Sequence, residues 1–166
     1  NLCSVINSIQ NMVKSQFDDM NIDLQFTSTG RLIENAEDCE LEACNVPVYP
    51  DIMKQVMMNC LQNSKEAVLL RVQSGEIARG KVSIDIERPR GEIIIRMTDN
   101  GCGVPEELLD KVFDPYFTTK DESIGIGLGL YISKNILEEH MAVTITLENI
   151  EEGAVVTLRF KASDSV

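Results

Sequence analysis

Residues 81–103 have the sequence KVSIDIERPRGEIIIRMTDNGCG, in which a Pro- and Gly-containing turn separates two apolar segments. The alternation at residues 81–87 and the apolar run at 92–98 predict two strands. The turn at residues 88–91 predicts that these strands pair as an antiparallel hairpin. The second strand ends at Asp99 and is followed by two closely spaced glycines. This stretch therefore predicts a sheet with a polar, Gly-rich loop at one end.

Further helices and strands flank this hairpin on both sides. Apolar residues at intervals of three and four predict helices at residues 2–18, 50–73 and 128–139. Period-two patterns predict three more strands, at residues 21–27, 142–148 and 154–160. Because the strands come in adjacent pairs, we predict an α+β fold. Its form would be a two-layer α/β sandwich, with a five-stranded, mixed but mostly antiparallel sheet and about three helices on one face.

Two segments give weaker signals. The acidic run at residues 34–42 is expected to be a solvated loop or a short helix. Residues 46–49 can form at most an edge strand, because Pro47 cannot donate a hydrogen bond to a neighbouring strand. No internal repeat or flexible linker divides the chain, so its 166 residues are expected to contain one compact domain.

The composition limits the classes of partner. Lys and Arg number 15 against 27 Asp and Glu, which gives a net charge of −12. Such a surface repels nucleic acid and anionic lipid, so we expect neither as a partner. No run of about 20 apolar residues is present, and we expect a cytoplasmic location without direct membrane contact. The five cysteines lack the spacing of a zinc site and are expected to be reduced thiols.

A pair of amides lies on the long predicted helix. Asn59 and Asn63 are four residues apart, which places both side chains on one helix face. Mg²⁺ prefers oxygen ligands and keeps several waters, so two amide oxygens and the phosphates of a substrate would hold it. Two solvated asparagines on a helix surface are the commoner explanation for such a pair taken alone.

A carboxylate and two glycines follow the central hairpin. Asp99 stands where the strand ends, and Gly101 and Gly103 come directly after it. A carboxylate fixed there can accept a hydrogen bond from an exocyclic amine such as that of adenine, and the glycines allow a flat ring to approach. A Gly-rich turn with a capping Asp is the alternative. Cys102, between the glycines, is expected to be a small buried filler, and the alternative is a thiol whose oxidation would affect nucleotide binding.

A second group of glycines precedes the third predicted helix. Gly125, Gly127 and Gly129 alternate with Ile126 and Leu128. Backbone N–H groups at such a helix start can bind phosphate oxygens, because the positive end of the helix dipole lies behind them. A dinucleotide-binding βαβ unit is excluded, since no strand immediately precedes the segment.

Four motifs therefore occur in order along the chain, because residues 113–120, FDPYFTTK, lie between the two glycine groups. Together they resemble the N, G1, F and G2 boxes of sensor histidine kinases. These kinases belong to the superfamily of ATP-binding domains that includes gyrase, Hsp90 and MutL. The resemblance covers roughly residues 46–161, and all four boxes at these spacings are far less common by chance than any one of them.

The resemblance implies a role for each motif. Asn59 and Asn63 are similar to catalytic residues that also bind Mg²⁺, and Lys120 to a catalytic cation near the phosphates. Asp99 resembles the adenine-binding carboxylate. The other positions that the resemblance implies for binding ATP are Gly101, Gly103, Val104, Phe113, Gly125, Gly127, Leu128 and Gly129. Residues 104–124 would form a lid over ATP, with Phe113 and Phe117 as its hydrophobic hinges.

The resemblance also implies a domain organisation and partners. Residues 1–20 would be a helical connection to a missing dimerisation domain, and residues 21–162 the ATP-binding catalytic domain. The implied cofactors are ATP and Mg²⁺. The implied partners are the histidine-bearing dimerisation domain of the same protein and the receiver domain of a response regulator, and the full-length protein would be a homodimer.

The residue at position 59 distinguishes a kinase from an ATPase. Relatives that hydrolyse ATP resemble one another in carrying Glu there, where it can deprotonate water, whereas the amide of Asn59 cannot. The only histidine, His140, does not match the family's acceptor position, and a helix-end surface residue is expected there. Ile126, Ser64 and Met141-Ala142 depart from the family pattern. A nucleotide-binding regulatory module without phosphotransfer is therefore the alternative to a protein-histidine kinase domain.

Overall fold

The computed structural model describes residues 2–34, 49–89, 92–118 and 127–160. Its helices are α1 (Leu2–Asp19), α2 (Pro50–Gln73), the 3₁₀ helix η4 (Glu106–Lys111) and α3 (Gly129–His140). Its strands are β1 (Ile22–Ser28), β2 (Arg31–Leu32), β3 (Gly80–Glu87), β4 (Ile93–Asp99), β5 (Val143–Ile150) and β6 (Gly153–Phe160). The expectations for residues 35–48 fall outside the described residues.

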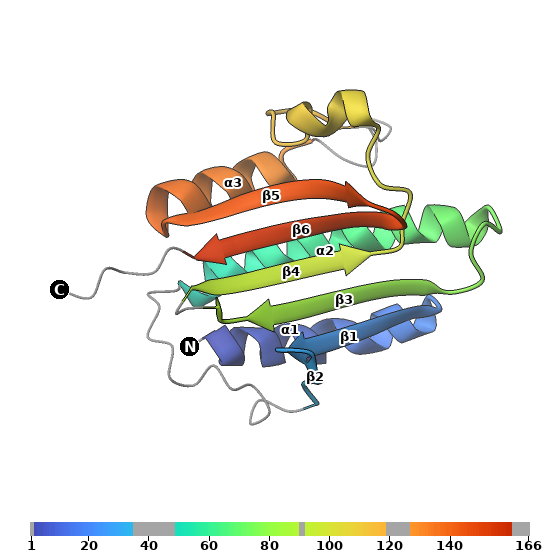
Figure 1. Cartoon of the computed structure of the whole chain (residues 1–166), viewed down its shortest axis with the longest axis horizontal. Coiled ribbons are helices and arrows are strands. Elements are labelled where there is room, and N and C mark those ends of the chain that lie inside the picture. Colours follow the sequence, from blue (N-terminus) through green and yellow to red (C-terminus); the bar gives the residue numbers. More distant parts are fainter. Residues whose placement is uncertain (1, 35–48, 90–91, 119–126, 161–166) are drawn as a thin grey trace.

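The six strands form one sheet in the order β2-β1-β3-β4-β6-β5 (Figure 1). Only β1 and β3 pair in parallel, with Ile22 opposite Gly80, and the other neighbours are antiparallel. The predicted α+β sandwich with a mixed, mostly antiparallel sheet is confirmed. The sheet has six strands rather than five, because β2 adds two exposed residues at one edge. Two residues are too few to produce a period-two pattern in the sequence.

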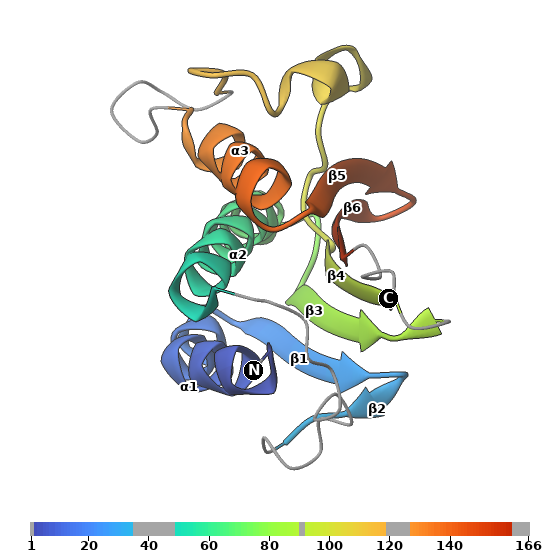
Figure 2. The same ribbon diagram turned by 90° about the vertical axis from the view of Figure 1, so that its left-hand side faces the viewer.

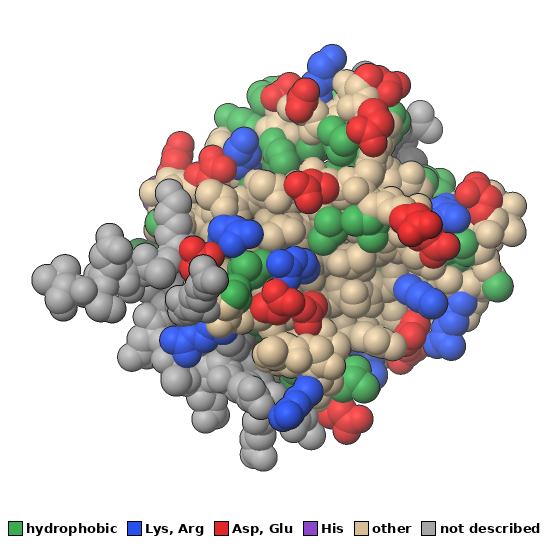
Figure 3. Space-filling view, in the orientation of Figure 1, with side chains coloured by type: hydrophobic (Ala, Val, Ile, Leu, Met, Phe, Trp, Pro, Cys, Tyr) green, Lys and Arg blue, Asp and Glu red, His purple; other side chains and the backbone are tan. Residues whose placement is uncertain are grey.

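The three α-helices cover one face of the sheet, which gives the two layers seen in Figure 2. The core lies between the layers and is formed mainly by aliphatic side chains of α1, α2 and the central strands. Burial alternates along β3, where Val82, Ile84 and Ile86 are buried, so every second side chain points toward the helices. The opposite face carries interspersed acidic and basic side chains (Figure 3). None of the helices in the described ranges has both the length and the apolar character needed to cross a bilayer.

Helix α1 is part of this core. Leu2, Ile6, Ile9 and Val13 are buried, and α1 packs against α2 and β1. Met12 shares the three- and four-residue spacing that predicted this helix, but it is 57% exposed. At 100° per residue it lies beyond the edge of the buried face. The role of residues 1–20 as a connection to another domain stays a prediction.

Two local features differ from the sequence expectations. Residues 104–124 were expected to form a lid, and in the described part of that segment Glu106–Lys111 form η4, a helix that no sequence pattern predicted. None of the six residues of η4 is buried, so the sequence contains no apolar periodicity that would predict this helix. Cys3 is disulfide-bonded, so the expectation of reduced thiols is wrong at this position. The other cysteines in the described ranges, Cys60 and Cys102, are free.

Candidate functional site

One face of α2 carries residues toward the candidate site at intervals of four. Asn59, Asn63, Ala67 and Arg71 are each partly buried, and they follow one another by about one helical turn. Asn59 contacts Ser133 of α3, and Ala67 and Arg71 contact the loop that follows β4. Helix α2 therefore spans both predicted parts of a nucleotide site, the amide pair at one end and the Asp99 loop at the other.

Asp99 is the last residue of β4 and is only 6% exposed. Its Oδ1 accepts a hydrogen bond from the backbone N–H of Gly101 at 2.9 Å. Burial raises the pKa of the Asp99 carboxyl, while hydrogen bonds from the Ser64 side chain and the backbone of Gly101 and Ala154 act to lower it. The result is a buried acid with a fixed orientation, which is the geometry needed to recognise a polar ligand edge.

The loop after Asp99 approaches α2 very closely. A Cβ atom placed on Gly101 would lie 2.6 Å from Cβ of Ala67, which is closer than side chains pack. Gly101 is buried, and Gly103 has φ +64°, a backbone conformation that glycine adopts without strain. Glycine is thus required at both positions by the fold of the loop itself.

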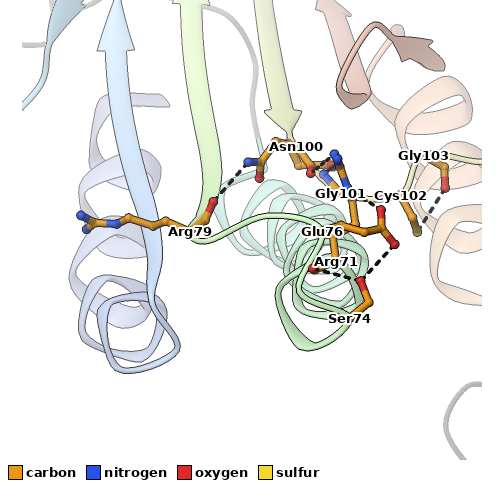
Figure 4. Close-up of polar contacts among 9 residues, drawn as sticks. Arg71, Ser74, Glu76, Arg79, Asn100, Gly101, Cys102 and Gly103 are labelled. Atoms are coloured by element: carbon orange, nitrogen blue, oxygen red, sulfur yellow. Dashed lines mark hydrogen bonds and ion pairs between the residues drawn. The ribbon is translucent and has the colours of Figure 1, made fainter.

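Polar contacts hold the loop from the side of the α2 C-terminus (Figure 4). Nη1 of Arg71 donates to the carbonyl oxygen of Asn100 at 2.9 Å, and Nε of Arg71 pairs with Glu76 at 3.3 Å. The Asn100 side chain accepts from the N–H of Lys81 at 2.7 Å and donates to the carbonyl of Arg79 at 3.3 Å. These contacts tie the loop to α2 and to the start of β3.

A cleft of about 420 Å³ opens behind the loop, lined by Arg71, residues 101–103 and the β5–β6 turn. Cys102 lines this cleft and is exposed, so the prediction of a buried filler is wrong. Its neighbours Gly101 and Gly103 turn the chain such that the side chain of Cys102 points outward. The free thiol that is buried is that of Cys60, in α2, whose pKa is raised by burial to about 12.

Asn59 lies beside the start of α3. Its Nδ2 donates to the hydroxyl of Ser133 at 3.3 Å, and a Cβ on Gly129 would lie 3.8 Å from Cγ of Asn59. Since the amide nitrogen faces Ser133, the carbonyl oxygen is the atom that Asn59 presents for a ligand. Asn63 follows one turn later on the same face of α2. An oxygen of this kind suits Mg²⁺, so the described residues fit the metal that the motif implies.

Residues 104–118 lie beyond α3 and β5, at the edge of the sandwich (Figure 1). Both N–H and C=O of Val104 bond to the side chain of Asn149. Phe113 packs against the core, and Nζ of Lys134 lies 5.3 Å from its ring centroid. Gly127 has φ +69°, and a Cβ at this position would collide with the backbone of Phe117. The segment is thus anchored at its start, at its middle and at the glycines before α3.

The predicted site residues fall into two groups. Most of them lie in the described ranges, on α2, in the loop after β4, in the segment 104–118 and at the start of α3. They are Asn59, Asn63, Asp99, Gly101, Gly103, Val104, Phe113, Gly127, Leu128 and Gly129. Lys120, Gly125 and Ile126 fall outside those ranges, so their roles stay predictions. His140 is the exposed last residue of α3, as expected for a helix-end histidine.

Several residues at the site were not identified from the sequence. Ser64 was noted only as a departure from a motif, and it proves to hydrogen-bond Asp99. Ala67 and Arg71 continue the stripe of Asn59 and Asn63 at intervals of four, which is a signal that could have found them. Ser133 and Asn149 carry no local signal, because their partners lie 74 and 45 residues away.

Comparison with known proteins identifies the family. The family model of "Histidine kinase-, DNA gyrase B-, and HSP90-like ATPase" matches residues 49–164. This chain belongs to that family. Among curated relatives, the sensor histidine kinase ZraS of Salmonella typhimurium is 32% identical over 160 residues, which are 95% of this chain and 30% of ZraS. A putative NtrY-like sensor histidine kinase of Rickettsia conorii is 38% identical over 108 residues, 65% of this chain and 17% of that protein.

Solved structures agree with this assignment. The catalytic domain of the histidine kinase ThkA matches with a TM-score of 0.74 and 29% identity, covering 98% of this chain and 95% of that one. ThkA in complex with the response regulator protein TrrA matches with a TM-score of 0.73 and 28% identity, covering 98% of this chain and 41% of ThkA. The chain is a histidine kinase ATPase catalytic domain, and it spans less than a third of the length of these curated relatives.

Proposed function

We propose that this domain binds Mg·ATP and transfers the γ-phosphate to a histidine on a separate dimerisation domain of the same protein. The observation that carries the proposal is the stripe along α2. It brings an amide pair to the start of α3 at one end and a buried carboxylate, Asp99, to a Gly-shaped loop at the other. A ligand with a flat polar base and a charged tail matches such a site.

At the base end, Asp99 supplies the hydrogen-bond acceptor. With Oδ1 held by Gly101, the carboxylate remains available for the exocyclic amine of adenine. A Cβ on Gly101 would lie 2.9 Å from Oδ1 of Asp99, so glycine at this position keeps a side chain away from the carboxylate. This end would fix the orientation of the nucleotide.

At the phosphate end, Asn59 and Asn63 would hold Mg²⁺ through their amide oxygens. When bound, the metal supplies charge neutralisation at the β- and γ-phosphates. Ser133 orients Asn59 by accepting from its Nδ2, and backbone N–H groups at the start of α3 would bind the phosphates. In α2, Glu66 is the nearest acid in sequence to Asn63, and its Oε1 accepts from Gln62. Position 59 holds Asn, whose amide cannot deprotonate water, and this favours a nucleophile from another domain.

Phosphotransfer in trans tests the proposal. The domain is mixed with the dimerisation domain of its own protein and γ-labelled ATP, and acid-labile phosphohistidine is measured alongside free phosphate. The expected result is label on the partner histidine, lost in Asn63→Ala but retained in the matched control Asn11→Ala on the exposed surface of α1. Binding of Mg·ATP without transfer to the partner would contradict the kinase function and leave a nucleotide-binding regulatory module.

We propose that the receiver domain of a response regulator is the downstream partner and that the full-length protein is a homodimer. The support is the likeness to ThkA, which has been crystallised with the response regulator protein TrrA. Transfer from the phosphorylated dimerisation domain to a purified receiver domain would test this part, and phosphohistidine that no receiver consumes would contradict it.

A further inference from the structure

We propose that Asn149 is a positioning residue for nucleotide binding, which fixes the loop between Asp99 and Val104 by clamping the backbone of Val104. The proposal rests on the proposed function of the Asp99 site and adds a residue on a strand that none of the four motifs contains. Asn149 is the penultimate residue of β5, 45 residues beyond Val104.

The clamp consists of two hydrogen bonds from one carboxamide. Oδ1 of Asn149 accepts from the N–H of Val104 at 2.9 Å, and Nδ2 donates to the carbonyl oxygen of Val104 at 2.6 Å. Nδ2 also lies 3.3 Å from Oε1 of Glu106, at the start of η4. Only one orientation of the amide satisfies both groups of Val104, because the opposite orientation would face donor to donor and acceptor to acceptor. The side chain thus pairs with Val104 as a neighbouring strand would.

The register of the sheet explains how Asn149 can act on the Asp99 loop. Asp99 on β4 is opposite Ala154 on β6, and Ala154 is opposite Asn149 on β5. Directly opposite residues share one face of a sheet, so Asp99 and Asn149 lie in the same row, two strand spacings or about 10 Å apart. The chain that leaves Asp99 crosses β6 and reaches Asn149 at Val104. The loop is therefore fixed at both ends by residues of one row.

Gly103 shows how tightly the clamp is fitted. A Cβ on Gly103 would lie 2.8 Å from Oδ1 of Asn149 and 3.3 Å from the carbonyl oxygen of Gly153. Gly103 also has φ +64°, so glycine is needed at this position both for the backbone conformation and for the close approach of Asn149. The need for glycine at position 103 is then explained by loop positioning and does not require direct contact with the nucleotide.

The test compares Asn149→Ala with two controls on β5. Glu148→Ala changes the exposed neighbour that does not contact Val104, and Ile145→Val lowers stability by shortening a buried side chain. Mg·ATP affinity is measured by calorimetry, unfolding by urea, and amide exchange at Val104 by NMR in the nucleotide-free protein. Asn149→Asp, which retains the acceptor for the N–H of Val104 but loses the donor, is a second variant if Asn149→Ala unfolds.

We expect Asn149→Ala to weaken Mg·ATP binding by about tenfold and to speed exchange at Val104 by at least as much, because two hydrogen bonds are lost. Glu148→Ala should bind within about twofold of the unmodified domain, and Ile145→Val should lose stability without losing affinity. Unchanged affinity in both Asn149 variants, or an equal affinity loss in Ile145→Val, would overturn the inference alone. Failure of the unmodified domain to bind Mg·ATP would instead contradict the proposed function, and the inference with it.

Discussion

The two ends of the α2 stripe differ in how firmly the protein itself holds them. At the base end, Asp99 is 6% exposed and its loop is held by Ser64, Arg71 and Asn149. At the phosphate end, Asn59 donates a long hydrogen bond to Ser133, at 3.3 Å. Among the described contacts, those at the base end fix both the carboxylate and its loop, whereas the contact of Asn59 fixes only its amide nitrogen. A site of this kind would select the base with a rigid pocket and complete the phosphate shell with the ligand's own metal and charge.

The largest effect is expected from Asp99→Asn. This change replaces one oxygen by an amide donor that faces the donor of the adenine amine, so affinity for ATP, ADP and adenosine should all fall, by about 100-fold. Asp85→Asn is the matched control, because Asp85 lies on the adjacent strand and bonds Thr27. Calorimetric titrations with the three ligands measure the effect. Loss of ATP binding with adenosine binding intact would place the base elsewhere.

A substitution at the other end should produce the opposite pattern. Asn63→Ala is expected to weaken Mg·ATP binding by about tenfold, because one metal ligand is lost, and to leave adenosine binding unchanged. The dependence of ATP affinity on Mg²⁺ concentration should also become weaker, and titration of Mg²⁺ at a fixed ATP concentration measures this. An equal loss for adenosine and Mg·ATP would show that Asn63 supports the fold of the pocket instead of the phosphates.

Two glycines that face α2, one at each end of the stripe, allow the rigidity of the two ends to be compared through protein stability. Gly101→Ala would force a Cβ to 2.6 Å from Ala67 and is expected to cost about 1–3 kcal/mol of unfolding free energy. In Gly129→Ala the added Cβ would lie 3.8 Å from Cγ of Asn59, an ordinary packing distance. This variant should be more stable by up to about 1 kcal/mol, because Ala has a higher helix propensity than Gly. Urea unfolding of both variants measures the difference. Equal destabilisation by Gly101→Ala and Gly129→Ala would contradict the claim that the base end is more rigid than the phosphate end.

The smallest effect is expected in the pH dependence of stability. Burial raises the pKa of Asp99 above its ordinary value of 3.8, so the native state binds the proton more tightly than the unfolded state. The domain should therefore lose stability relative to Asp99→Asn as pH rises from about 3.8 through the native pKa, and the difference should be constant above it. Urea midpoints of both proteins across this window measure it. A difference that changes in the opposite direction would mean that hydrogen bonds outweigh burial.

Much of the fold was predictable because it is encoded locally. The period of two in β3 and the uninterrupted helical pattern after Pro50 placed both elements within a residue of their observed bounds. The two residues of β2 and the fully unburied η4 carry no periodic signal, so they could not be found in the same way. The parallel pairing of β1 with β3 depends on where α2 returns the chain, which is a property of the whole fold.

The site was predictable to the extent that its residues belong to short motifs. Asp99 and Asn59 stand out because carboxylates and amides at such positions have a recognisable chemistry. Ser64, Arg71 and Asn149 hold Asp99 or the loop that follows it. Their contacts span 29 to 45 positions in the sequence, and the Ser64 side chain is unremarkable by itself. Single-sequence patterns cannot contain such contacts, because they arise when α2 packs on the sheet and when the sheet register brings distant residues into one row.

Hydrogen exchange with and without ligand tests the difference between the two ends most directly. Adenosine and Mg·ATP are compared on the same domain, and protection is followed at residues 100–103 and at 105–118 with 127–129. We predict that residues 100–103 exchange slowly in the free protein and gain little with either ligand. Residues 105–118 and 127–129 should gain strong protection with Mg·ATP but not with adenosine. Rapid exchange of residues 100–103 in the free domain, with protection appearing at both ends together, would contradict the account.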